Sequence, residues 1–136
     1  MNSRAWVGVS LVRIASVYLL VGLVLGLTMA LRRDFSLLSV HSHILLLGWA
    51  TLATTGIVYL VLPRCADTGL AVAHFWLHNL GLAVAMASLA AETLGEPRAE
   101  PLVGVGSILV IVGLGLFTVN VLRNARASDA ADSPAV

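Results

Sequence analysis

Four apolar stretches, each close to the roughly 20 residues that cross a bilayer as a helix, account for almost the whole chain. Charged residues make up only 11% of the 136 residues, whereas about a quarter of a typical soluble domain is charged. The sequence therefore predicts an all-α membrane protein with one transmembrane domain, residues 1–126, and a disordered polar tail, residues 127–136. The expected spans are residues 6–31, 38–62, 70–91 and 102–122.

The connections between the spans are short, so consecutive helices are expected to be antiparallel neighbours in an up-down-up-down bundle. Orientation depends on the arginines, because the chain contains no lysine. The side of the two termini carries Arg4, Arg13, Arg64, Arg123 and Arg126, and the other side carries Arg32, Arg33 and Arg98. The positive-inside rule favours termini in the cytoplasm. We therefore expect a multi-pass protein of a bacterial inner membrane.

Two histidines separated by one residue, His41 and His43, lie inside the second span, where imidazoles are costly to place. A helix turns about 100° per residue, so the two side chains point about 200° apart, to nearly opposite sides. One chain cannot offer both rings to one metal ion, but it can offer one ring to each of two neighbouring sites. Because neutral imidazole is a common ligand of heme iron, the pattern predicts heme. In the alternative interpretation each ring hydrogen-bonds a carbonyl or hydroxyl group.

The third span carries a second pair, His74 and His78, four residues apart on one helical face. This spacing can chelate copper, zinc or another metal ion. It also suits hydrogen bonds between helices, and that interpretation is favoured here.

Arg32 and Arg33 end the first span near the expected depth of His41. Guanidinium groups bind carboxylates well, so the two arginines are candidates to hold the propionates of a heme. Both side chains could instead extend to the membrane interface, and the sequence leaves the two interpretations open.

Residues 41–49, His-Ser-His-Ile-Leu-Leu-Leu-Gly-Trp, and residues 59–64, Tyr-Leu-Val-Leu-Pro-Arg, resemble the tenth helix of the catalytic subunit of heme-copper oxidases. The likeness is greatest to the C-family oxidases, whose motif reads His-x-His-x-Gly-Ala-Leu-Gly-Trp and closes in Tyr-x-x-Val-Pro-Arg. Residues 74–76, His-Phe-Trp, resemble the start of the following helix, and residues 106–123 are similar to the twelfth. The chain thus resembles a short four-helix protein of the oxidase subunit I-like type.

The resemblance implies an oligomer. The oxidase subunit is a twelve-helix bundle of three four-helix units, so a chain similar to one unit could form the whole as a homotrimer. In the oxidases the first histidine of the tenth-helix pair holds the high-spin heme. The second holds the low-spin heme together with a histidine of a symmetry-related helix. The resemblance therefore implies heme b (iron protoporphyrin IX) held between His43 of one protomer and His41 of the next.

The chain also departs from the oxidases. Beyond its four histidines nothing could supply the histidine ligands of a copper centre, and the second span lacks the acidic residues of nitric oxide reductases. No catalytic residue is therefore predicted, and electron transfer or binding of O2 or NO is the expected role. The alternatives are a copper- or zinc-handling or respiratory-complex assembly protein without heme, and a purely structural subunit. The expected partners are the lipid bilayer, further copies of the chain, and a redox protein or quinol, with no nucleic acid.

Overall fold

The computed structural model describes residues 5–126, and the regular elements in that range are all helical. They are α1 (Trp6–Arg32), α2 (Leu38–His43), the π-helix η1 (Ile44–Thr51), α3 (Leu52–Val61), α4 (Pro63–Ala66), α5 (Gly69–Thr93), the 3-10 helix η2 (Pro97–Ala99) and α6 (Glu100–Asn124). Four helical segments are long and apolar enough to cross a membrane, which confirms the expected all-α, multi-pass architecture. The tail predicted for residues 127–136 lies outside the described residues.

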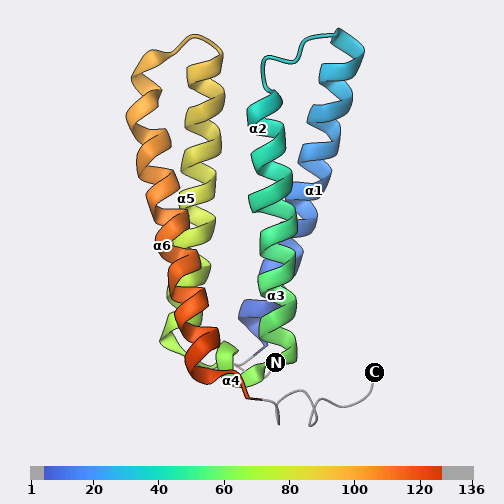
Figure 1. The fold of residues 1–136 in the computed structure, drawn as a ribbon. Helices are drawn as coiled ribbons and strands as arrows, with labels where there is room; N and C mark the ends of the chain where they lie inside the picture. The colour runs from blue at the N-terminus through green and yellow to red at the C-terminus, as the bar shows by residue number, and fades with distance from the viewer. Residues whose placement is uncertain (1–4, 127–136) are drawn as a thin grey trace.

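The long helices pair as two antiparallel hairpins, α1 with α2–η1–α3 and α5 with α6 (Figure 1). The short helix α4 joins the hairpins at the end of the bundle where α1 begins (Figure 1). At the other end, the α1–α2 and α5–α6 connections stand apart (Figure 1). Packing is more extensive within each hairpin than between them. The seam between the hairpins is therefore the more loosely packed part of the bundle.

Local sequence explains several helix ends. Arg33 closes α1 in the left-handed conformation, with a φ of 52°, and its backbone N–H donates to the carbonyl of Ala30. α3 ends at Val61, just before Leu62 and Pro63, because the residue that precedes a proline is disfavoured in helical conformation. Thr68 caps α5, since its Oγ1 accepts a 3.1 Å hydrogen bond from a backbone N–H of the first turn.

Glycines bring the helices of each hairpin into backbone contact. A Cβ atom added at Gly8 of α1 would lie 2.9 Å from the carbonyl oxygen of Gly56 in α3. A Cβ atom added at Gly106 of α6 would lie 2.5 Å from the backbone nitrogen of Ala85 in α5. Small residues at such crossings are the usual means of close helix packing in membranes. Each hairpin is therefore a tightly packed unit.

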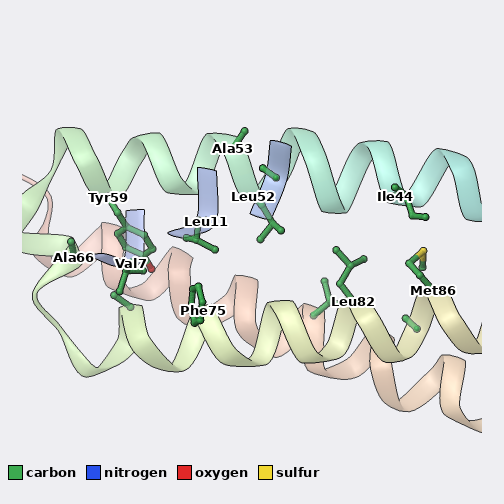
Figure 2. Close-up of a cluster of buried hydrophobic side chains, with 14 of the residues drawn as sticks. Val7, Leu11, Ile44, Leu52, Ala53, Tyr59, Ala66, Phe75, Leu82 and Met86 are labelled. Atoms are coloured by element: carbon green, nitrogen blue, oxygen red, sulfur yellow. The ribbon is translucent and has the colours of Figure 1, made fainter. Parts of the chain in front are cut away.

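The core lies where the two hairpins face each other, and Leu11, Leu52 and Leu82 are fully buried there (Figure 2). The outer surface is apolar as well, with Leu31 and Leu122 about four-fifths exposed. An apolar outer surface suits lipid tails rather than water. The packing therefore agrees with a bundle embedded in a bilayer.

Candidate functional site

His43 of α2 faces an apolar groove between the two hairpins. Its Nδ1 lies 2.7 Å from the carbonyl oxygen of Ser39, one turn earlier in the same helix. Because a carbonyl can only accept, Nδ1 carries the proton and donates it, which leaves the Nε2 lone pair available. Histidines that bind metals are usually held in this way, with the second ring N–H on a carbonyl. His43 is exposed and so able to meet a ligand.

The groove has a volume of about 240 Å³ and is almost entirely apolar. Its walls come from α2, η1, α5 and α6, and are formed by His43, Leu47, Leu82, Ala85, Met86, Leu89, Val103, Ser107, Val110, Ile111 and Leu114. Met86 adds a thioether, which also belongs to the known ligand types of heme iron. The groove is smaller than the roughly 300–1,000 Å³ of pockets that enclose small ligands. The donor chemistry fits heme, but a porphyrin would extend beyond the groove toward lipid or a second copy.

His41 contacts α1 and not the groove that His43 lines, as the helical spacing of the two residues predicts. Its Nδ1 lies 2.9 Å from the carbonyl oxygen of Gly22 in α1. The ring rests on Gly26, where an added Cβ atom would lie 2.7 Å from the imidazole Cε1. Gly26 thus leaves room for the His41 ring, and Gly22 supplies the carbonyl that it contacts. Here too Nδ1 donates to a carbonyl, so Nε2 keeps its lone pair.

His74 and His78 of α5 are both fully buried. The Nδ1 of His74 lies 3.2 Å from the hydroxyl oxygen of Tyr59 in α3. The Nε2 of His78 lies 3.1 Å from the carbonyl oxygen of Leu47 in η1. Each ring therefore links the two hairpins by one hydrogen bond. The other nitrogen of each ring has no hydrogen-bond partner among the described residues; these atoms are His74 Nε2 and His78 Nδ1.

The π-helix η1 lies between these two sets of histidines. Its hydrogen bonds span five residues instead of four, and such segments are frequent at functional sites. The hydroxyl of Thr51 follows the same wide spacing, donating to the carbonyl of Leu46 at 2.8 Å. Leu47 both lines the groove of His43 and accepts the hydrogen bond from His78. η1 thus connects the groove with the buried pair.

The two arginines proposed for propionates lie at the loop end of the bundle. Arg32 and Arg33 are exposed, and neither lines the groove of His43. Arg32 instead lines a smaller pocket of about 150 Å³ with Asp34, Ser36 and Leu94. Hydrogen bonds from Ser36 hold the pKa of the exposed Asp34 carboxyl below its usual range. The interfacial and propionate interpretations of the arginines both stay predictions.

Three features of the site are missing from the sequence interpretation. They are the Tyr59 hydroxyl on His74, the Leu47 carbonyl on His78, and Met86 in the groove. A tyrosine inside an apolar run is a visible signal, because a buried hydroxyl needs a partner. The carbonyl contact has no sequence signal, since any residue supplies a carbonyl. Among the described residues no three His, Cys, Asp or Glu side chains group closely enough to hold a metal ion.

A scan against models of known protein families finds no match, and comparisons with curated proteins and with solved structures find no similar chain. The multi-pass membrane character therefore depends on the four apolar helices themselves. The likeness to heme-copper oxidases stays a resemblance between short motifs.

Proposed function

We propose that this chain is a heme b-binding protein of a bacterial inner membrane that transfers electrons or binds a diatomic gas. The observation that supports this proposal is the hydrogen bonding and the exposure of the His43 ring. Its Nδ1–H is held by the Ser39 carbonyl at 2.7 Å, and its exposed ring lines an apolar groove between two hairpins. An imidazole with an available Nε2 lone pair and apolar surroundings is what a heme iron requires. A bound heme would supply an iron that changes its charge by one electron.

Two residues could supply a second ligand to a bound heme. The resemblance to oxidases implies His41 of a neighbouring protomer in a homotrimer. The groove itself offers Met86, on the hairpin opposite His43. Two histidines would favour electron transfer, because both iron positions are then filled. A gas could bind only where one of the ligands leaves the iron or is absent.

The function also requires an electron donor or acceptor, for which we propose a redox protein or a quinol. Arg32 and Arg33 lie at the loop end of the bundle and would bind the propionates of a heme that reaches this end. Substituting both with glutamine is expected to weaken heme retention or to shift its reduction potential. If neither property changes, the arginines are interfacial residues only.

The test is the visible spectrum of the detergent-purified protein, oxidised, dithionite-reduced and then exposed to carbon monoxide. We expect sharp reduced heme bands in the wild type and loss of stoichiometric heme in His43→Ala. The control is Ser42→Ala, because Ser42 lies between the histidines and its exposed hydroxyl donates to the Leu38 carbonyl of its own helix, at 2.9 Å. A protein that stays colourless after hemin is added would refute the proposal.

His41→Ala separates the two candidates for the second ligand. If His41 of a neighbour binds the iron, this variant becomes reactive toward carbon monoxide while it retains heme. If His41 only packs against α1, the spectrum stays that of the wild type. The oligomeric state, measured by light scattering in detergent, tests the homotrimer independently of the spectrum.

A further inference from the structure

Two imidazoles lie next to each other in the interior of the bundle, away from the groove of His43. The rings of His74 and His78 have centroids 5.5 Å apart, at an angle of 73°. Both side chains have no exposed surface. In the described part of the chain, His74 Nε2 and His78 Nδ1 are buried without a hydrogen-bond partner. Buried polar atoms are normally paired, so this pair of nitrogens requires an explanation.

The protonation state of His78 follows from its neighbour. Its Nε2 contacts the carbonyl oxygen of Leu47 at 3.1 Å, and a carbonyl can only accept. Nε2 therefore carries the proton, and Nδ1 presents a lone pair. His74 has the equivalent arrangement when its Nδ1–H donates to the Tyr59 hydroxyl oxygen at 3.2 Å. Both unpartnered nitrogens are then lone-pair donors.

We propose that His74 Nε2 and His78 Nδ1 together bind one Cu(I) ion, at a site distinct from that of the heme. Histidines that bind metals almost always donate their other ring N–H to a carbonyl or another acceptor, which fixes the tautomer. The Leu47 carbonyl has this role for His78, and the Tyr59 hydroxyl has it for His74 in the tautomer that donates from Nδ1. A metal–imidazole bond is about 2.0–2.1 Å long, so two nitrogens sharing an ion lie within about 4 Å. The ring centroids are 5.5 Å apart, so the proposal requires that these two nitrogens face each other.

The choice of Cu(I) follows from what surrounds the pair. No third His, Cys, Asp or Glu of the described residues joins it. Zn²⁺ normally takes four ligands, whereas Cu(I) accepts fewer, and imidazole suits copper. The two histidines are sealed from solvent, so water cannot readily complete a zinc site. A single positive charge also costs less to bury than a double one.

The experiment is an anaerobic titration of the purified wild-type protein with Cu(I) against a coloured Cu(I) chelator. We expect stoichiometric copper binding in the wild type and its loss in the His74→Gln, His78→Gln double variant. Tyr59→Phe removes the hydroxyl oxygen but keeps the ring, and it should weaken binding by about 10- to 100-fold. Ser42→Ala is the control, since its exposed hydroxyl bonds the Leu38 carbonyl and its loss should leave copper binding unchanged. Circular dichroism checks that each variant is folded.

X-ray absorption at the copper edge of the loaded wild type keeps the proposal testable even where a variant does not fold. Nitrogen scatterers of the imidazole type support the site, and a sulfur scatterer overturns it. The proposal is also wrong if the wild type binds no stoichiometric copper, if the double variant binds it equally well, or if only zinc binds. None of these results depends on the heme content of the protein.

Discussion

A glycine at the crossing of α5 and α6 allows a sharp test of the packing. A Cβ atom at Gly106 would lie 2.5 Å from the nitrogen of Ala85, 2.6 Å from the oxygen of Gly81 and 2.8 Å from the Cα of Ala85. All three are backbone atoms, so no change of rotamer relieves the overlap and the helices must separate. Overpacking of this kind costs about 1–3 kcal/mol. We therefore expect Gly106→Ala to lower the free energy of unfolding by about 2 kcal/mol.

The matched control is Gly104→Ala, two residues away on the same helix. Gly104 is exposed, and an added Cβ atom there meets nothing within 4 Å. Alanine is the better helix former, so this variant should be neutral or stabilised by up to about 1 kcal/mol. The assay is unfolding of both variants in mixed detergent micelles with increasing SDS, followed by circular dichroism. If Gly106→Ala unfolds at the same SDS fraction as Gly104→Ala, the described close contact of α5 and α6 is wrong.

Three further predictions concern single hydrogen bonds made by Thr68, Asn120 and Ser36. Thr68→Ala removes the cap of α5 and should cost about 1 kcal/mol in the same unfolding assay, whereas Thr68→Ser should cost less. Asn120→Leu removes a buried donor to the Cys65 carbonyl at 2.8 Å and should cost about 1 kcal/mol; a variant as stable as the wild type would contradict this bond. Ser36→Ala keeps the backbone N–H that donates to Asp34 Oδ1 at 3.0 Å and removes only the hydroxyl, so NMR titration should show the pKa of Asp34 rise only part of the way toward its usual range. Because the folded pKa is depressed, any stability from Asp34 is present at neutral pH and is lost as the pH falls below about 4.

Much of the fold could be predicted from the sequence, because length and apolar composition alone determine how a chain can cross a membrane. The short connections also predicted antiparallel neighbours. The division into two hairpins could not be predicted, since surfaces that face lipid and surfaces that face another helix are equally apolar. Close approaches at glycines such as Gly8 against Gly56 and Gly81 against Gly106 mark the faces that meet another helix, whereas Gly104 and Gly115 of α6 meet nothing within 4 Å, so a glycine in the sequence does not by itself mark such a face.

The candidate site was predicted less completely. The spacing of His41 and His43 predicted different neighbours, and the structure places one ring on α1 and the other in the groove. The residues facing His43 lie on the other hairpin, so Met86 could not be found without a three-dimensional arrangement. The heme, the copper ion and the homotrimer stay proposals. Each of them requires a cofactor, an ion or further copies of the chain, which one chain alone does not contain.

The wide turns of η1 also set the rotational phase between the two halves of the second membrane helix. An α-helix advances about 100° per residue, and a π-helical turn holds more residues in each turn. Deleting one residue within Ile44–Thr51 could convert the segment to an ordinary α-helix without shortening the helix much. His43 and Tyr59 would then keep nearly their present directions, because the wide turns take up one more residue than α-helical turns over nearly the same rotation. The groove and the buried histidine pair therefore keep their relative directions when the wide turns are lost, whereas deleting a residue from an α-helical part of the same membrane helix would rotate one against the other by about 100°.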